Sequence, residues 1–250
     1  MKFEVSSATE KGKRPYQEDR LVIHETSEVY LLGVFDGHGG DEVADKCAVL
    51  MPKVFDAVRS AVLVANFENM VREVFHVLNA ETKDCYAGTA ASIVLLPKHG
   101  KEAIIGILGD APVMLQKTDG DIWLSPEHNV RTNSAERAAA EGRGGTVHNG
   151  YLFATFSGGG LQMSRALGDR ELGKVLDRTP EIFRVPVGAG GFILVASDGL
   201  FDPSHEECPK DEISAKIKNG LDAQQLANDA VCKPTFDNVS AILVKISEDR

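Results

Sequence analysis

The sequence predicts an α+β fold in which two antiparallel β-sheets pack together and pairs of antiparallel helices cover them, giving layers in the order α-β-β-α. Strand-like segments occur in clusters and do not alternate regularly with helices, which argues against a doubly wound parallel sheet. Apolar residues at helical spacing occur in pairs of neighbouring segments. No composition break or internal repeat divides the 250 residues, so one domain is expected over residues 1–250.

The first part of the chain is predicted to hold three strands followed by two helices. Lys2–Ala8 alternates polar and apolar residues, as a half-buried strand does, and strands at Arg20–His24 and Val29–Asp36 follow around a short turn. Apolar residues then recur at helical spacing from Val43 to Val58 and again from Phe67 to Leu78. These stripes predict two amphipathic helices with one apolar face each.

The second part begins with strands and ends with a helix pair and a strand. Strand character returns at Thr89–Leu96 and Ala103–Leu108, and Asp119-Gly120 predicts a hairpin turn between Val113–Gln116 and Ile122–Leu124. The remaining predicted elements are a helix at Thr132–Glu141, a glycine-rich mobile loop or flap at Gly142–Gly160, a strand from Phe192, helices at Lys210–Lys218 and Asp222–Val231, and a strand at Val239–Ile246.

Composition and charge narrow the classes of partner. The formal net charge of −10 weighs against nucleic acid and anionic membranes and is compatible with binding cations. The first residues lack the apolar core of a signal peptide, and no apolar run is long enough to span a bilayer. The cysteines (Cys47, Cys85, Cys208 and Cys232) lie far apart, which favours reduced thiols in a cytoplasmic protein.

Carboxylates stand at the ends of several predicted strands. Asp36 ends the apolar run from Val29 and is followed by a glycine-rich turn that contains His38, and Asp198 ends a second run in the same way. Asp237 stands just before the last strand, and other acids near strand ends are Glu18, Asp19, Asp110 and Asp202. Any single Asp could simply favour a turn. If these ends meet at one edge of a sandwich, however, their oxygens suit Mg²⁺ or Mn²⁺.

Seven short segments, in order and over nearly the whole chain, resemble motifs of the metal-dependent Ser/Thr protein phosphatases of the protein phosphatase 2C family. They are Gly12–Asp19, Val34–Gly40, Gly88-Thr89-Ala90, Gly109-Asp110, Ser164–Asp169, Ala196–Asp202 and Asp237-Asn238-Val239. The fold of that family is a sandwich of two antiparallel sheets flanked by helix pairs, which agrees with the predicted order of elements. One departure is Ala111-Pro112, where the family usually continues with Ser-Arg, and it leaves the geometry of the adjacent site open.

The resemblance implies a role for each matching residue. Asp36 would bridge two metal ions, Glu18 and the Gly37 carbonyl would serve one of them partly through water, and Asp198 and Asp237 would hold the other. A third, weaker metal site would take Asp110, Asp198 and Asp202. Arg14 would bind the substrate phosphate, His38 would be the general acid, and Asp19 would be an acid that supports the metal ligands. The segment Ser164–Asp169 is expected to be structural and to pack under the flap.

These roles imply hydrolysis of phosphoserine and phosphothreonine proteins. A water activated by two metal ions would attack phosphorus directly while His38 protonates the departing oxygen. The enzyme is expected to be a monomer in the cytoplasm or the nucleus, without nucleic-acid or membrane partners. One alternative is a catalytically inactive binding scaffold, but such a protein would be expected to lose metal carboxylates that this chain retains. Another is a metal-dependent phosphodiesterase, but the negative net charge disfavours nucleic-acid substrates.

Overall fold

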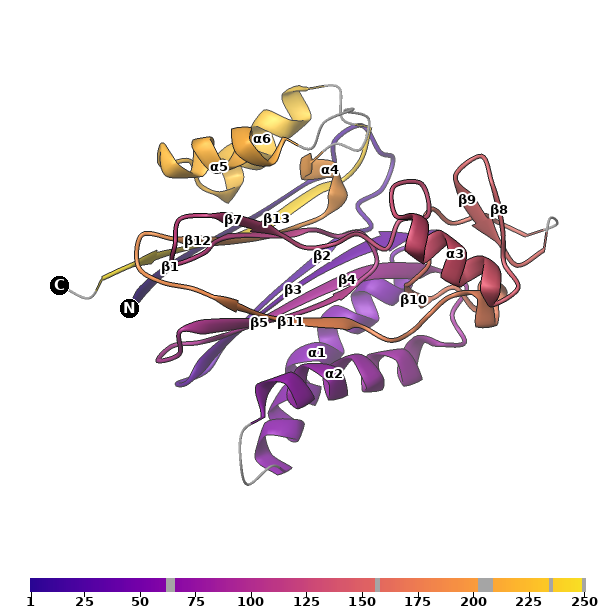
Figure 1. The fold of residues 1–250 in the computed structure, drawn as a ribbon, viewed down its shortest axis with the longest axis horizontal. Helices are drawn as coiled ribbons and strands as arrows, with labels where there is room; N and C mark the ends of the chain where they lie inside the picture. The colour runs from indigo at the N-terminus through magenta and orange to yellow at the C-terminus, as the bar shows by residue number, and fades with distance from the viewer. Residues whose placement is uncertain (62–65, 156–157, 202–208, 234–235, 249–250) are drawn as a thin grey trace.

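Two antiparallel β-sheets lie face to face at the centre of the molecule (Figure 1), in a computed structural model that describes residues 1–61, 66–155, 158–201, 209–233 and 236–248. The first sheet has the order β1 (Lys2–Glu10), β13 (Val239–Ser247), β12 (Phe192–Ala196), β6 (Val113–Gln116) and β7 (Ile122–Leu124). The second has the order β11 (Glu181–Pro186), β5 (Glu102–Leu108), β4 (Gly88–Pro97), β3 (Val29–His38) and β2 (Arg20–Glu25), and β10 (Leu167–Gly168) pairs with β4. The predicted fold class is confirmed.

Helices cover the outer face of each sheet (Figure 1). The helices on the second sheet are α1 (Glu42–Ala61) and α2 (Phe67–Thr82), and those on the first are α4 (Asp198–Phe201), α5 (Lys210–Lys218) and α6 (Ala223–Cys232). At one end of the sandwich lie α3 (Ser134–Gly142), the hairpin of β8 (Thr146–His148) and β9 (Tyr151–Phe153), and the 3₁₀ helix η1 (Arg170–Val175). None of the helices in the described ranges is long and apolar enough to cross a bilayer.

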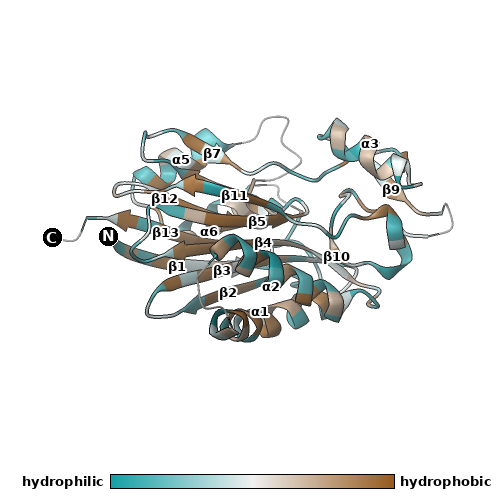
Figure 2. Ribbon diagram, turned by 60° about the horizontal axis from the view of Figure 1, so that its bottom comes forward, coloured by the Kyte–Doolittle hydropathy of each residue, from teal (hydrophilic) through white to brown (hydrophobic). Residues whose placement is uncertain are grey.

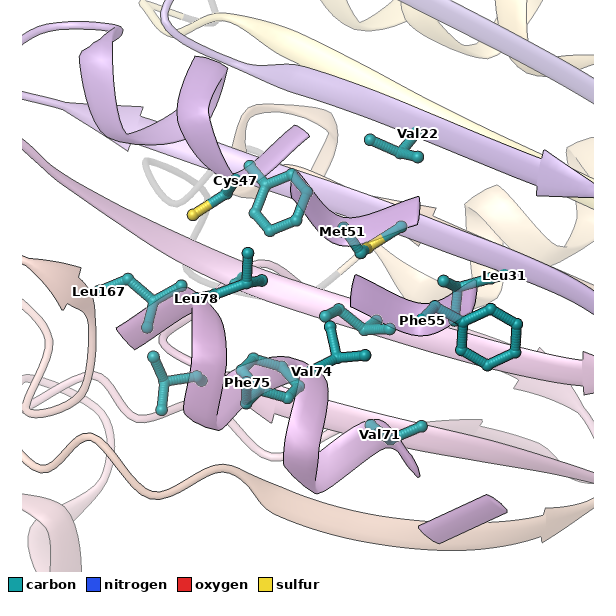
Figure 3. Close-up of a cluster of buried hydrophobic side chains, with 14 of the residues drawn as sticks. Val22, Leu31, Cys47, Met51, Phe55, Val71, Val74, Phe75, Leu78 and Leu167 are labelled. Atoms are coloured by element: carbon teal, nitrogen blue, oxygen red, sulfur yellow. The ribbon is translucent and has the colours of Figure 1, made fainter. Parts of the chain in front are cut away.

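The alternation of side chains along each strand builds the layers. In β3, Leu32 and Val34 face the other sheet, whereas Leu31 and Phe35 face the helices, because successive side chains of a strand point to opposite faces. Apolar residues accordingly concentrate in the strands (Figure 2). Figure 3 shows the cluster between α1, α2 and the second sheet, which contains Leu31, Met51, Phe55, Val71, Val74, Phe75 and Leu78. Both faces of the second sheet are therefore buried, and its functional residues lie at its ends.

The segment Gly142–Gly160 differs from its prediction as a loop or flap, since its described part contains the β8–β9 hairpin. Besides the 3₁₀ helix η1, three further elements were not predicted from the sequence. The strand β10 has two residues and α4 has four, too few for a periodic signal. The third, β11, is an edge strand that contains Arg184 and ends in Pro186, and charged residues and proline are typical of edge strands.

Candidate active site

A cleft of about 540 Å³ lies at the end of the sandwich where β3, β5 and β12 end and β13 begins. Seven residues singled out from the sequence line it, namely Arg14, Asp36, Gly37, His38, Asp110, Asp198 and Asp237. Its remaining lining consists of Arg131, Tyr151 and the segment Gly160–Met163. The chain thus gathers four carboxylates and two arginines in the same cleft.

The pleat of β3 directs Asp36 into this cleft. Asp36 lies two residues beyond Val34, so both side chains are on the face that looks toward the other sheet. On the neighbouring strand, Ala90 stands opposite Asp36 and leaves room for it. The backbone N–H of Asp198 donates a hydrogen bond of 3.3 Å to Asp36 Oδ2, which ties the end of β12 to the end of β3. One carboxylate thereby joins the two sheets.

Asn238 attaches the N-terminal part of the site to the C-terminal strand. Its side-chain oxygen accepts from the backbone N–H of Glu18 at 2.9 Å, and its Nδ2 donates to the carbonyls of Lys11 at 2.8 Å and Tyr16 at 2.9 Å. The Asn238 side chain is buried, so each of these bonds is protected from water. The segment that carries Arg14 and Glu18 is therefore held along the start of β13.

Arg14 and Glu18 have defined partners within that segment. Arg14 Nη2 lies 2.7 Å from Asp237 Oδ2, and its Nε donates to the Phe236 carbonyl at 2.9 Å. Glu18 Oε1 accepts from the backbone N–H of Gly40 at 2.6 Å, so its carboxylate faces the turn after β3. Arg14 lines the cleft next to a predicted metal ligand, whereas Glu18 is not among the residues that line it.

His38 forms a close pair with Asp169, a residue that the sequence did not indicate as functional. The Asp169 carboxylate lies 2.8 and 2.9 Å from His38 Nε2, and its side chain is only 10% exposed. The other ring nitrogen, Nδ1, is buried and has no hydrogen-bond partner among the described residues. Gly88 makes the pair sterically feasible, since a Cβ there would lie 1.9 Å from Asp169 Oδ2 and 2.3 Å from His38 Nε2.

Asp169 itself has an uncommon backbone conformation. Its φ of 51° and ψ of 51° lie in the left-handed region, which few non-glycine residues adopt. Its backbone N–H donates to the Ala87 carbonyl at 3.0 Å, and its carbonyl accepts from Arg178. These bonds hold the carboxylate against His38 at a conformational cost of about 1–3 kcal/mol, which is typical of residues retained for function.

Asp110 is positioned by residues that follow β7. Asn129 Nδ2 donates to Asp110 Oδ2 at 3.0 Å, and the Gly109 N–H donates to His128 Nδ1 at 3.0 Å. Ser92 Oγ bonds the carbonyl of Ala111. The turn at Gly109-Asp110 is therefore held by these bonds although Ala111-Pro112 replace the usual Ser-Arg.

Burial raises the pKa of the acids at the cleft. It is the main reason that the pKa of Asp36 and that of Asp198 lie well above the ordinary value, and repulsion from neighbouring carboxylates adds to both shifts. Burial likewise raises the pKa of Asp110, although its hydrogen bond from Asn129 opposes the shift. Behind the cleft, burial raises the pKa of Asp19 to about 6 against the bonds from Ser240 and Ser197. Without a cation, these negative charges destabilise the folded protein.

The donor set suits divalent cations. Asp36, Asp110, Asp198 and Asp237 all offer carboxylate oxygens, the ligands that Mg²⁺ and Mn²⁺ prefer. No three of these carboxylates have oxygens that all lie within 4.8 Å of one another.

A second group of possible ligands, His128, Glu136 and Glu181, does meet that distance limit. Arg165 already lies among them, with Nη2 at 2.5 Å from Glu136 and 3.5 Å from Glu181. Because the Arg165 guanidinium pairs with both acids, this group is an internal ion-pair network.

Not every residue predicted for the site can be placed in the cleft. Asp202 lies outside the described residues, and Asp19 is buried behind the cleft. Sequence reasoning missed the roles of Asp169, Asn129 and Asn238. The only available signal was that Asp169 and Asn238 belong to segments already noted for their family resemblance.

Comparison with known proteins is consistent with this geometry. The family model described as Protein phosphatase 2C matches residues 5–239. A rice protein named Probable protein phosphatase 2C 59 is 30% identical over 99% of this chain and 77% of its own length. An Arabidopsis thaliana protein named Probable protein phosphatase 2C 71 is 29% identical over 100% of this chain, which spans 57% of that relative's length.

Solved structures share the fold. A sex determining protein of C. elegans superposes with a TM-score of 0.81 at 24% identity, over 97% of this chain and 64% of its own. A serine-threonine phosphatase 2C from Toxoplasma gondii superposes with a TM-score of 0.77 at 20% identity, over 97% of this chain and 94% of its own. At these identities the structural likeness supports the fold alone.

Proposed function

Because the chain belongs to the protein phosphatase 2C family, whose members are metal-dependent serine/threonine phosphatases, we propose that it hydrolyses phosphoserine and phosphothreonine in proteins. The observation that carries the proposal is the cleft that Asp36, Asp198 and Asp237 line together with Arg14 and His38. It combines oxygen ligands for cations, a guanidinium for phosphate and an imidazole for proton transfer, which are the groups needed to cleave a phosphate monoester. The monomeric state and a cytoplasmic or nuclear location stay predictions from the sequence.

Asp36, Asp198 and Asp237 would hold two divalent cations, Mg²⁺ or Mn²⁺, with the Gly37 carbonyl and Glu18 supporting one of them, partly through water. Asp110, with Asp198 and Asp202, would serve a third and weaker ion. When bound, the cations would lower the pKa of a water toward neutrality and offset charge on the phosphoryl oxygens. The raised pKa values of Asp36 and Asp198 support this assignment, since a cluster that is costly when empty gains the most from a cation.

Arg14 would bind the substrate phosphate. Its guanidinium is held at the cleft by Asp237 Oδ2 and the Phe236 carbonyl through Nη2 and Nε. The planar group has five N–H donors, so other N–H groups remain for phosphoryl oxygens, which a guanidinium binds in a two-pronged manner. The ion pair with Asp237 therefore orients Arg14 before substrate arrives.

His38 would protonate the departing serine or threonine oxygen, and Asp169 would fix the ring for this step. The Asp169 carboxylate lies within hydrogen-bond distance of Nε2, which fixes the orientation of the ring at the cleft. General acid catalysis of this kind is worth roughly 10²–10⁴-fold in rate. A weakly basic leaving group such as p-nitrophenolate needs this proton far less than an alkoxide does.

The direct test is a hydrolysis assay with a phosphothreonine peptide, p-nitrophenyl phosphate and bis(p-nitrophenyl) phosphate, each with Mn²⁺ and with EDTA. We expect cation-dependent hydrolysis of both monoesters and none of the diester. Hydrolysis of the diester would favour a phosphodiesterase. The absence of turnover, in protein shown by calorimetry to bind Mn²⁺, would favour an inactive binding scaffold.

The roles of His38 and Asp169 are tested by the variants His38→Ala and Asp169→Ala and by the double variant. If Asp169 acts through His38, the double variant should lose little more activity on phosphothreonine peptide than His38→Ala alone. Losses that multiply would show that Asp169 acts independently of the ring.

A further inference from the structure

Three polar residues that line the cleft take no part in the proposed chemistry. Arg131 Nη1 donates to Gln162 Oε1 at 3.3 Å, and Gln162 Nε2 donates to the Tyr151 hydroxyl at 3.0 Å. All three side chains line the same cleft as Asp36. They come from the segment after β7, from β9 and from the segment before Met163, so the fold brings together parts of the chain that are separate in sequence.

Arg131 is held in place at both ends. Its backbone N–H donates to Asn129 Oδ1 at 2.9 Å, and Asn129 also bonds Asp110. Its aliphatic stem packs over the turn between β8 and β9, where a Cβ on Gly150 would come within 2.6 Å of Arg131 Cγ. Glycine at that turn leaves the space in which the stem lies. Although Arg131 is exposed, its position is thus defined by contacts on both sides.

Among the described residues, Arg131 differs from Arg14 in that no carboxylate pairs with its guanidinium. Its side-chain acceptor is the neutral amide of Gln162. Arg14, by contrast, is paired with Asp237. The guanidinium of Arg131 therefore retains its full charge and most of its N–H donors for a ligand in the cleft.

We propose that Arg131, Gln162 and Tyr151 form a subsite for an anionic group of the substrate polypeptide, a carboxylate or a second phosphate, close in sequence to the residue being dephosphorylated. The proposal rests on the proposed function. A guanidinium binds either anion with two parallel hydrogen bonds. Because the whole chain carries a net charge of −10, it repels acidic polypeptides overall, and a local cation is needed to select them.

The experiment compares phosphothreonine peptides that differ at one position near the phosphothreonine, scanned on both sides. That position carries Gln, Glu or a phosphonate side chain that cannot be hydrolysed, and the readout is the ratio of kcat/KM for the anionic and the Gln peptide. A charge-assisted hydrogen bond contributes about 1.5–3 kcal/mol, so we expect the best position to give a ratio of about tenfold or more. Preference for Glu over the phosphonate, or the reverse, identifies the anion.

Arg131→Gln should bring that ratio close to one, Arg131→Lys should keep part of it, and Arg131→Glu should favour a Lys-substituted peptide. The matched control is Arg137→Gln, since Arg137 is an exposed arginine on α3 that pairs with Glu141 and does not line the cleft. Arg137→Gln should leave the ratio unchanged.

Two results would overturn the subsite. One is a wild-type ratio near one at every position, and the other is a preference that survives Arg131→Gln. Affinities of peptides with a phosphonate at the scissile position, measured by fluorescence anisotropy, should show the same ratios as the kinetics. Wild-type protein that hydrolyses none of the peptides with Mn²⁺ would refute the proposed function itself, and the subsite with it.

Discussion

Without divalent cations, the free energy of unfolding should rise as the pH falls, and the contribution of Asp19 to this effect can be worked out. Burial raises the pKa of Asp19 from 3.8 to about 6. Between these two values the folded state binds more protons than the unfolded chain does, so the free energy of unfolding rises as pH falls through about 6. Above that pH Asp19 is ionised in both the folded and the unfolded state, and its buried charge destabilises the folded protein by the full amount.

The magnitude follows from the shift. A difference of about two units in the pKa of Asp19 corresponds to about 3 kcal/mol of destabilisation at neutral pH. Lowering the pH from about 7.5 to about 5.5 should recover about 1 kcal/mol of this, or a rise of roughly 2–4 °C in Tm for a chain of this size. Asp36 and Asp198, whose pKa values are also raised, add to the effect with the same sign.

The assay is thermal unfolding in EDTA at several pH values, with the wild type compared to Asp19→Asn. The comparison is needed because His128 acts in the opposite direction. Burial lowers the pKa of its ring, so protonation of histidine in the unfolded chain removes stability as pH falls. His128 is common to both proteins, and the difference between their curves isolates Asp19. Parallel curves for the two proteins would refute the assignment of a buried, ionised Asp19.

Three further predictions concern the cleft. Asp36→Asn should remove nearly all turnover while circular dichroism stays native, and near-normal activity at saturating Mn²⁺ would contradict its role as a ligand. A hundredfold excess of Mn²⁺ over Kd should add about 2.7 kcal/mol to the free energy of unfolding, or roughly 5–10 °C in Tm, and an unchanged Tm would argue against a cation site. Gly88→Ala should separate His38 from Asp169, since its Cβ would lie 1.9 Å from Asp169 Oδ2, and should slow phosphothreonine hydrolysis roughly 10²-fold with less effect on p-nitrophenyl phosphate. Gly142→Ala, whose Cβ would meet nothing within 4 Å, is the control.

The long elements could be predicted because each carries its own periodicity. The apolar stripe of α1 and the continuous apolar run of β3 are properties of neighbouring residues, and they also place Asp36 where its strand leaves the core. The two residues of β10 carry no such pattern, and Arg184 and Pro186 obscure β11. For these strands the pairing with an existing sheet decides the structure, and that information is not local.

The same distinction applies to the candidate site. The acids next to apolar runs could be recognised as ligands, since their position in the sequence already places them at strand ends. Asp169 could not be matched to His38, which is 131 residues away, and nothing near Asn129 indicates that it bonds Asp110, 19 residues earlier. Contacts of this kind depend on how the sheets are stacked, which no local pattern specifies.

The position of β13 has a consequence for the order of events during synthesis. This strand lies between β1 and β12 and pairs with both, so the first sheet cannot close until residues up to Ser247 have left the ribosome. The two residues just before it, Asp237 and Asn238, also hold Arg14 and Glu18. A nascent chain that lacks β13 has unpaired edges on β1 and β12, the kind of edge that promotes aggregation. Addition of β13 thus completes the cleft and protects these edges in the same step. The contacts that this step needs join residues far apart in the sequence, and such contacts form slowly.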